Sequence, residues 1–436
     1  MKIAIIGTGI AGNVIAHHLH EKHDISVFEK NSHIGGHTHT HSIEDVDGKT
    51  HNIDTGFIVL NDRTYPHFNA LLQELDIAIN PTEMSFSVKC DQTGLEYNGN
   101  NLNTLFAQRS NIISPRFYRM IADILRFNKQ ATALVCEQQD FDSAITLGSF
   151  LSEHGYSDIF IEKYIVPMGA AIWSTRPEDM FRFPAAFFFR FFHNHGLLTV
   201  DDRPQWYVVE GGSRAYVDKL TAPFTDRIRT DCPVRAIRRD ATGVTIDTDT
   251  GSEHFDYVFI ASHSDEALAM LDKPSQLETD TLSAIEYQRN EAVLHTDESL
   301  LPKRKLAWAA WNYHLQGQND HGPNDGRNKD VTLTYDMNIL QGHESSQTFC
   351  VSLNDTSNID EDKVIKKMVY HHPVFTPDGI RAQSNHRLIN GTSRTYYCGA
   401  YWRNGFHEDG VVSALVALEH FEEDMKNEQL PLRRAG

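Results

Sequence analysis

The segment KIAIIGTGIAGNVIAHHLHEKHDISVFEK, residues 2–30, decides the fold. It opens with the β-branched run KIAII, which is typical of a buried parallel strand. A glycine-rich turn follows, then a helical pattern that continues to Lys22, and then a second strand over residues 25–28. A strand, a helix and a second strand in this order form the βαβ unit of an α/β protein. We therefore predict an α/β domain that begins at the first strand.

The glycines of this segment have the spacing G-x-G-x-x-G. The first allows a tight turn, the second lets the backbone approach a pyrophosphate, and the third lets the helix and the strand pack closely. The helix N-terminus then faces the phosphates. Glu29 ends the second strand, about 20 residues on, where an acidic side chain accepts hydrogen bonds from ribose hydroxyls. The pattern predicts a dinucleotide site made by Gly7, Gly9, Ile10, Ala11, Gly12, Glu29 and Lys30.

The composition limits the class of protein. The chain has 436 residues, is 40% hydrophobic and 23% charged, and is therefore globular. Its net charge of −19 argues against a nucleic-acid partner, because phosphate binding needs a basic surface. Its five scattered cysteines fit a reducing compartment better than a disulfide framework. No apolar run is long enough to span a bilayer, and the N-terminal run has no cleavage site. We expect a cytoplasmic protein.

The segment HIGGHTHTHS, residues 33–42, allows two interpretations. His37, His39 and His41 alternate along an extended segment and partly match a cupin metal motif, but the second histidine-containing half of that motif is missing. A metal site needs three or four convergent ligands. The glycine pair before the histidines favours the alternative, in which the segment contacts the same cofactor as the first turn. We therefore predict no metal.

The position of the glycine pair, six and seven residues after Glu29, resembles that in the two-dinucleotide-binding-domain flavoproteins. In that family the pair is usually followed by Arg and passes over the pyrophosphate of FAD; here His37 replaces the Arg. The stretch NIDTGFIV, residues 52–59, resembles the next element of the family, whose backbone runs beside the flavin. The resemblance implies that FAD is contacted by Gly35, Gly36, His37, Thr38, Thr55, Gly56 and Phe57.

Two later segments resemble further elements of the flavin amine oxidase superfamily. In residues 208–263 the backbone near Val234 is implied to meet the adenine. The stretch YYCGAYWRNGFHEDGVVSALVALEHF, residues 396–421, resembles the closing motif, in which a glycine turn leads into a helix that points at the flavin. The amides of this helix would stabilise negative charge on reduced flavin. The residues concerned are Gly399, Gly410, Val411 and Val412, and Cys398 is expected to be buried, so that FAD is bound non-covalently.

Three separated segments, 1–60, 205–270 and 385–436, are thus predicted to form one FAD-binding domain. The insertions 61–204 and 271–384 are predicted to form a substrate-binding domain of helices and a mixed sheet. The fold class is a Rossmann-like, two-dinucleotide-binding-domain α/β flavoprotein, α+β in its substrate part. Only one dinucleotide fingerprint is visible, and FAD occupies it.

The first insertion contains two unusual apolar segments. In SPRFYRMIADILRFNK, residues 114–129, Ser114 is expected to cap a helix that begins at Pro115. Its apolar stripe includes Ile113, Phe117, Met120, Ile121, Ile124 and Leu125, opposite the basic residues Arg116, Arg119, Arg126 and Lys129. We favour a solvated basic face over a buried stripe; the alternative is contact with anionic lipid at the inner membrane. Residues 181–192 contain seven phenylalanines, which fit the wall of an apolar tunnel and a helical core equally well.

Over nearly its whole length the chain resembles a bacterial family of predicted NAD/FAD-binding oxidoreductases within this superfamily. The resemblance is carried by the blocks DTGFIVLNDRTYP, MSFSV, LFAQR, PMGAAIWST, FFHNHGLL, RPQW, VLHTDESLLP, WNYH and GFHEDG. Members are often encoded beside methyltransferases that resemble cyclopropane fatty acid synthase. The resemblance implies a fatty acyl substrate, methylated or unsaturated and carried on a phospholipid, and a lipid methyltransferase as a partner.

We therefore expect an FAD enzyme that removes hydride from an acyl chain to form or move a double bond. The lysine that amine oxidases hold near the flavin has no counterpart in YQRNEAVLHTD, residues 287–297, which weakens the case for an amine substrate. An amine oxidase, a redox-neutral flavin isomerase and a non-catalytic partner of the methyltransferase remain as alternatives. Proton transfer needs a group of near-neutral pKa close to the reacting carbon. The candidates are His407, Glu408, Tyr401, His193 and His195, with His407 first because it lies beside the flavin-facing turn.

Overall fold

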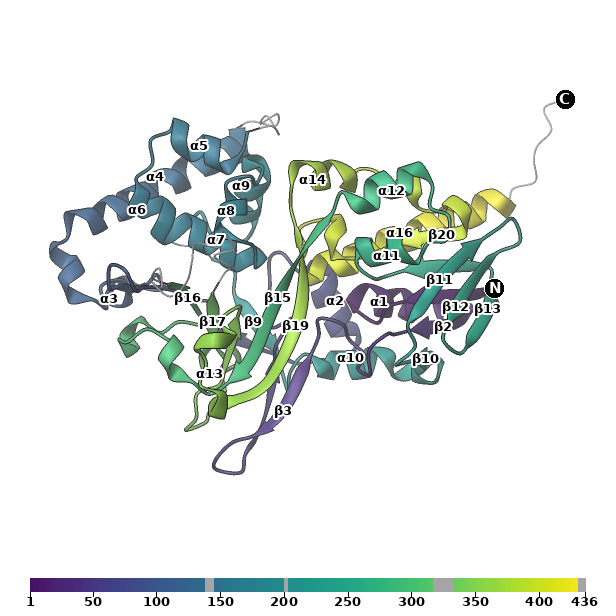
Figure 1. The fold of residues 1–436 in the computed structure, drawn as a ribbon, viewed down its shortest axis with the longest axis horizontal. Coiled ribbons are helices and arrows are strands. Elements are labelled where there is room, and N and C mark those ends of the chain that lie inside the picture. The colour runs from purple at the N-terminus through teal and green to yellow at the C-terminus, as the bar shows by residue number, and fades with distance from the viewer. Residues whose placement is uncertain (138–144, 200–202, 317–331, 430–436) are drawn as a thin grey trace.

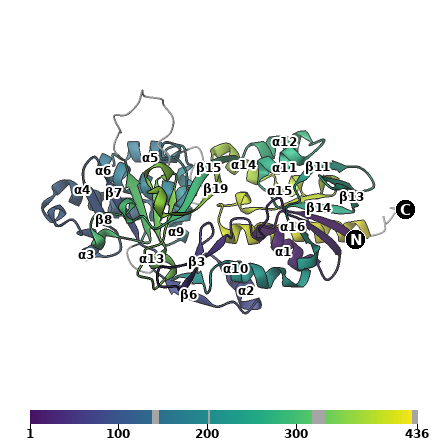
Figure 2. The ribbon, with the colours of Figure 1, turned by 60° about the horizontal axis from the view of Figure 1, so that its bottom comes forward.

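The computed structural model describes residues 1–137, 145–199, 203–316 and 332–429, which form two regions (Figure 1). The region that contains the N-terminus is built on a parallel sheet. The other region is built on a larger mixed sheet that helices cover on one side (Figure 2). The α/β class with a mixed sheet in the substrate part is confirmed. In the described part of the chain, no helix is both long and apolar enough to cross a membrane.

The parallel sheet joins strands from distant parts of the chain. In the described residues its order is β10 (Ile228–Arg229), β2 (Asp24–Phe28), β1 (Lys2–Ile6), β14 (Tyr257–Ile260) and β20 (Thr395–Tyr397). All of its pairings are parallel. These strands fall in the three segments that the sequence assigns to the FAD-binding domain.

Both faces of this sheet are buried, which explains the continuous apolar run in its first strand. Ile3 and Ile5 face one apolar cluster and Ala4 and Ile6 face another, as the two-residue period of a strand requires. The first cluster lies under the helices α1 (Ile10–Leu19), α2 (Pro66–Glu74), α10 (Arg214–Thr221) and α16 (His407–Gln429). The second lies under the strands β11 (Val234–Arg239), β12 (Val244–Thr248) and β13 (Gly251–Phe255) and the helices α11 (Ser264–Met270) and α12 (Gln276–Ser283).

The substrate region has a seven-stranded sheet in the described residues. Its order is β19 (Val364–Val374), β15 (Glu286–His295), β18 (Cys350–Leu353), β17 (Leu333–Asp336), β16 (Trp311–Leu315), β7 (Phe86–Cys90) and β8 (Leu95–Asn98). The pairing of β16 with β7 is parallel and the other pairings are antiparallel. The helices beside it are α4 (Pro115–Glu137), α5 (Leu147–Glu153), α6 (Asp158–Phe160), α7 (Val166–Trp173), α8 (Pro177–Met180) and α9 (Ala185–Asn194).

Smaller elements connect the two regions. Two small sheets lie here in the described residues: β3 (Thr40–Glu44) pairs with β4 (Thr50–Asp54), and β9 (Trp206–Val209) lies between β5 (Val59–Asn61) and β6 (Ile79–Thr82). The short helices include α3 (Leu102–Leu105), α13 (Met337–Gln341), α14 (Pro377–Gln383) and α15 (His386–Ile389). The long pair β15 and β19 runs between the regions across the middle of Figure 1.

The packing shifts the predicted domain boundaries. Helix α2 lies in the segment assigned to the substrate insertion, but Phe68 and Leu72 are buried in the apolar cluster of the parallel sheet. Leu282 of α12 is likewise buried against the other face of that sheet. The FAD-binding region therefore extends past residue 60 and past residue 270, because these helices cover faces of the sheet that would otherwise be exposed. The first helix also ends at Leu19 rather than at Lys22.

Candidate active site

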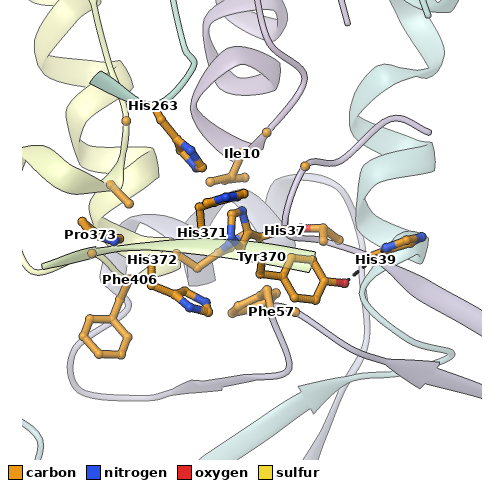
Figure 3. A pocket seen from close by; sticks show the side chains of 18 of the residues that line it. Ile10, His37, His39, Phe57, His263, Tyr370, His371, His372, Pro373 and Phe406 are labelled. Atoms are coloured by element: carbon orange, nitrogen blue, oxygen red, sulfur yellow. Dashed lines mark hydrogen bonds between the residues drawn. The ribbon is translucent and has the colours of Figure 1, made fainter. Parts of the chain in front are cut away.

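A cavity of about 1010 Å³ lies between the two regions and is lined by residues of both. Pockets for one small ligand measure about 300–1,000 Å³, so this cavity lies at the upper end of that range. One end meets the glycine turns after β1 and β2, and the other meets β7, α7 and α9. Figure 3 shows a part of the cavity where side chains of β19 lie together with His37.

Two glycines bring backbone segments into contact at the first end of the cavity. Gly7 has φ +99°, and a β-carbon there would lie 2.8 Å from the carbonyl oxygen of Ala261. Gly36 has φ +60°, and its β-carbon would lie 3.0 Å from Cα of Gly9. A larger side chain at Gly7 would push the first glycine turn away from the residues after β14, and one at Gly36 would push the glycine pair away from the first turn. The backbone there is shaped for close approach by a ligand.

Glu29 lies buried at the end of β2, beside the first glycine turn. Its carboxylate accepts hydrogen bonds from the backbone N–H of Thr8 (3.0 Å), the hydroxyl of Thr8 (2.6 Å) and the backbone N–H of Asn31 (2.9 Å). A buried carboxylate is costly unless it is hydrogen-bonded. These contacts fix Glu29 at the cavity wall, where the sequence predicts the ribose.

Most of the residues predicted to bind the cofactor line this cavity. They are Gly7, Gly9, Ile10, Ala11, Glu29, Lys30, Gly35, Gly36, His37, Thr38, Gly56, Phe57, Val234 and Gly399. The others do not line it: Gly12, Thr55, Gly410, Val411 and Val412.

Three of these other residues, Gly12, Thr55 and Gly410, lie behind the lining residues and help to position them. A β-carbon on Gly12 would lie 2.0 Å from the carbonyl oxygen of Gly7, so this glycine permits close packing of α1, as predicted. The hydroxyl of Thr55 donates a hydrogen bond to the backbone of the strand beside it (3.1 Å). A β-carbon on Gly410 would lie 2.6 Å from Cγ2 of Ile10, so Gly410 allows α16 to pack on α1.

The structure corrects the predicted start of the closing helix. The carboxylate of Asp409 accepts a hydrogen bond from the backbone N–H of Phe406 (2.9 Å), which starts α16 three residues before Gly410. The N–H of Gly410 already bonds to the carbonyl of Phe406 (3.1 Å). The amides of Val411 and Val412 lie farther along, where an α-helix uses them internally, so the predicted contact of these amides with the flavin is wrong.

A group of histidines lies at the centre of the cavity (Figure 3). The ring centroid of His37 is 5.8 Å from that of His263, 5.6 Å from that of His372 and 5.2 Å from that of Tyr370. Burial lowers the pKa of His37 and of His372 to about 3, and it also lowers the pKa of His263. These rings are therefore neutral, and His37 provides hydrogen-bonding groups in place of the positive charge of the usual Arg.

His407 is held in the cavity wall by a chain of hydroxyl groups. The hydroxyl of Tyr216 lies 2.6 Å from the hydroxyl of Thr38 and 2.7 Å from Nε2 of His407. The imidazole stacks on Phe57, with 3.7 Å between the ring centroids. Burial lowers the pKa of His407 to about 3, so the ring is neutral. The geometry gives His407 a fixed orientation.

The second end of the cavity is an apolar chamber. Its lining includes Met84, Phe86, Met168, Ile172, Trp173, Phe191, Leu197, Trp206, Trp311, Leu340, Phe375 and Phe406. Among the described lining residues the carboxylates are Glu29 and Glu266, and both belong to the FAD-binding region. The chamber is thus built to hold apolar groups. Of the phenylalanines in α9, Phe191 lines the chamber, whereas Phe188 and Phe192 are buried in the core.

His195 is the predicted catalytic candidate that lies in this chamber. Its Nδ1 lies 2.9 Å from the carbonyl oxygen of Phe191, and the two rings stack with centroids 3.8 Å apart. Because a carbonyl can only accept, Nδ1 carries the proton. Burial lowers the pKa of His195 to about 4, so the ring is neutral and Nε2 is left with a free lone pair. His193 does not line the cavity.

Glu408 and Tyr401 have different surroundings. The carboxylate of Glu408 accepts hydrogen bonds from the backbone N–H groups of His67 (3.0 Å) and Phe68 (2.8 Å), and it does not line the cavity. It therefore caps the N-terminus of α2, a structural role in place of the catalytic one. Tyr401 lines the cavity and packs against Gly399, where a β-carbon would lie 2.4 Å from its ring.

The alternating histidines that suggested a metal pack on other rings. The ring centroid of His39 lies 4.1 Å from that of His33 and 4.2 Å from that of His41, while His37 packs against His263 and His372. In the described ranges no three side chains of His, Cys, Asp or Glu are placed to hold a metal ion. Cys398 is fully buried, and burial raises the pKa of its thiol.

The family model for flavin containing amine oxidoreductases matches residues 10–417. The chain belongs to this family. Its members contain flavin, and this protein is an FAD-dependent oxidoreductase. The glycine turns and Glu29 fit the pyrophosphate and the ribose of that cofactor. No curated protein sequence matches the chain.

Solved structures of similar fold cover nearly all of this flavoprotein. Cyclohexylamine oxidase from Brevibacterium oxydans has a TM-score of 0.68 at 15% identity, over 98% of this chain and 99% of that one. The fatty acid isomerase from P. acnes that produces CLA has a TM-score of 0.64 at 15% identity, over 98% of each chain. A protein described as a protoporphyrinogen oxidase, from Exiguobacterium sp. 255-15, has a TM-score of 0.66 at 15% identity, over 97% of this chain and 99% of that one. At this identity the likeness shows the fold.

Several residues at the centre of the cavity escaped the sequence analysis. They are His263, Tyr370, His371 and His372. The last three lie on β19, which falls in the segment assigned to the substrate insertion. The cluster YHHP is the signal that could have identified them, because three successive polar rings followed by a proline are unusual in a strand.

Proposed function

We propose that this oxidoreductase removes hydride from a fatty acyl chain, methylated or unsaturated, to form or move a carbon–carbon double bond. The observation that carries the proposal is the chamber, which is lined by aromatic and aliphatic side chains and has no carboxylate among its described lining residues. Each buried methylene gains about 0.8 kcal/mol, whereas a protonated amine there would lose hydration without a charged partner.

The sequence blocks that resemble the bacterial family of predicted NAD/FAD-binding oxidoreductases support the same substrate class, because that resemblance implies a fatty acyl substrate. Met84 to Phe86 belong to the block MSFSV, and Met168 to Trp173 belong to PMGAAIWST. Trp206 of RPQW and Trp311 of WNYH also line the cavity. Four of the blocks that carry the family resemblance therefore contribute side chains to the lining of the cavity.

FAD, when bound, supplies a two-electron acceptor for hydride from a C–H bond. The protein has to hold the acyl chain in a dry chamber and remove a proton from the neighbouring carbon, so that loss of one hydride and one proton leaves a double bond. We assign the proton to Nε2 of His195, which is unprotonated because Nδ1 donates to the carbonyl of Phe191. Burial lowers the pKa of this ring to about 4, below the near-neutral value expected from the sequence, so it is always free to accept the proton at neutral pH but is a weaker base than an exposed histidine. His407, which is held by a hydrogen bond with Tyr216, forms part of the cavity wall on the cofactor side.

The alternatives differ in their electron balance. An isomerase of an acyl chain would return the hydride to the substrate and leave the flavin oxidised overall. An amine oxidase would reduce the flavin with small amines. A non-catalytic partner of a lipid methyltransferase would bind FAD and show no reduction by any substrate. The fold does not decide among them, because similar structures include amine oxidases and a fatty acid isomerase.

The test is an anaerobic absorption spectrum of the purified holoprotein with two sets of compounds. Phospholipids with methyl-branched or unsaturated chains should bleach the flavin, and cyclohexylamine or putrescine should not. Bleaching by the amines alone would overturn the proposal. If lipid leaves the flavin oxidised, chromatography of the recovered acyl chains decides: a moved double bond supports the proposed substrate class, and unchanged chains contradict it.

A further inference from the structure

Large apolar side chains are exposed together at the end of the substrate region farthest from the N-terminus, where α3 and α4 lie in Figure 1. Leu102 of α3 is 77% exposed and Ile113 is 85% exposed. Ile112, Tyr118 and Leu306 are exposed beside them. We call the surface formed by residues 99–126 and 303–308 the tip.

The elements of the tip are in contact with one another. The guanidinium of Arg109 donates hydrogen bonds to the carbonyl of Phe106 (3.0 Å) and to Oδ1 of Asn103 (2.7 Å), which joins the turn before α4 to α3. The rings of Phe106 and Tyr118 lie 6.0 Å apart, so α4 starts beside α3. The short helix Lys305–Ala307 contacts α3 from the other side.

The structure corrects the predicted burial of the apolar stripe in α4. Phe117 and Met120 are fully buried, as expected. Ile113 and Leu125, which the same helical spacing assigns to the stripe, are exposed. The helix therefore has apolar residues on both faces, and packing within the chain accounts for the inner face alone.

The charge of the tip is opposite to that of the whole chain. The net charge of the protein is −19, yet residues 97–122 contain no Asp or Glu. Among the described carboxylates, none lies within 4.0 Å of a basic nitrogen of Arg109, Arg116, Lys303 or Lys305. The nearby Asp123 is buried and already held by Arg119, Arg126 and Ser157. The tip is basic and apolar in an acidic molecule.

We propose that the tip binds the surface of an anionic lipid bilayer. Exposed apolar side chains among cations are the signature of shallow insertion at the level of the headgroups. Cations near an anionic leaflet are attracted to it, while the acidic remainder of the protein is repelled, so the molecule approaches with the tip first. The proposal goes beyond the reaction and does not depend on it, since it concerns residues outside the cavity.

The test is flotation of the full-length holoprotein with lipid vesicles. The protein should float with vesicles of phosphatidylcholine and phosphatidylglycerol, float much less with phosphatidylcholine alone, and detach as salt is raised. Leu102→Asp and Ile113→Asp should each weaken binding about tenfold or more, because each removes an inserted aliphatic side chain. Arg116→Glu and Lys305→Glu should each weaken binding to the anionic vesicles about fivefold or more.

The matched control is Val46→Asp, which changes an equally exposed aliphatic side chain, 74% exposed, in the turn between β3 and β4. It should bind vesicles as the unmodified protein does. The proposal is overturned if the protein binds neither vesicle, if binding survives Ile113→Asp, or if Val46→Asp weakens binding as much as the changes at the tip.

Discussion

The two ends of the cavity are built in different ways. At the cofactor end, backbone meets backbone, and glycines such as Gly7 and Gly36 allow the approach. In the chamber, side chains from β7, α7, α9 and β16 converge from distant parts of the chain. The cofactor end is therefore sensitive to the size of a few residues. The chamber should tolerate changes of similar volume and polarity but not a new charge.

The largest effect is expected at the glycine pair. Gly36→Val should abolish FAD binding, because its side chain would collide with the backbone of Gly9, 3.0 Å from the β-carbon position. The measurement is the ratio of flavin to protein absorbance after purification, with circular dichroism to verify folding.

Gly94 provides a matched control for this change. Its φ of +65° is close to the +60° of Gly36, and a β-carbon there would meet nothing within 4 Å. Gly94→Val therefore has a similar backbone cost, about 1–2 kcal/mol, without the collision. If both variants lose FAD equally, general destabilisation by the strained backbone rather than the close approach to Gly9 explains the loss.

A smaller effect is expected at His195, the imidazole of the chamber. His195→Asn should keep FAD and lower kcat about 10²–10⁴-fold, with little change in KM, because it removes the proton acceptor. Since burial lowers the pKa of His195 to about 4, the ring is neutral above that pH. The kcat/KM of the unmodified enzyme should be flat above about pH 5 and fall as the pH drops towards 4.

His193 lies two residues away, outside the cavity lining, and serves as the control. His193→Asn should retain normal turnover and the same pH profile. Full turnover in the His195→Asn variant would mean that another residue accepts the proton, and His407 would be the next candidate.

The chamber is tested by a single new charge. Met168→Asp should weaken acyl-chain binding by about tenfold or more, since a buried carboxylate must be desolvated or neutralised. Met168→Leu keeps the volume and should change binding less than about threefold. Titration of each holoprotein with lipid, followed by the flavin spectrum, measures both. Equal affinities would mean that the acyl chain does not occupy this part of the cavity.

The smallest effect is expected behind the cofactor wall. Tyr216→Phe removes the hydroxyl that bonds to Thr38 and to His407, which should cost about 1 kcal/mol and lower Tm by about 1–3 °C. Tyr207 has no such bond among the described residues, so Tyr207→Phe should leave Tm unchanged. A larger decrease in Tm, in a Tyr216→Phe variant that retains FAD, would indicate that Tyr216 also stabilises parts of the protein outside the cavity wall.

The cofactor end could be predicted from the sequence because its requirements are local. Gly7, Gly12 and Gly36 are separated by short, fixed distances along the chain, and a β-carbon at each would collide with backbone atoms. The same local logic failed at Val411 and Val412. There the side chain of Asp409 starts the helix early, and the spacing of glycines carries no information on such a cap.

The chamber could be predicted only in part, because long-range topology decides which residues meet. A run of phenylalanines fits the wall of a cavity and a buried core equally well, so its composition does not predict which residues line the chamber. In the structure, α9 places Phe191 at the chamber and Phe188 in the core. His372 reaches the cofactor end because β19 pairs with β15 across both regions. No local sequence pattern predicts the pairing of β19 with β15.

The long strand β19 also restricts how the chain can change in length. Met368, Tyr370 and His372 lie on its more buried face, and the side chains between them are exposed. Side chains of a strand alternate between its two faces with a period of two residues. One residue inserted or deleted in β19 before Tyr370 would therefore move Tyr370 and His372 to the exposed face. Relatives that keep this cavity should therefore differ in β19 by pairs of residues, and odd changes should be confined to its ends.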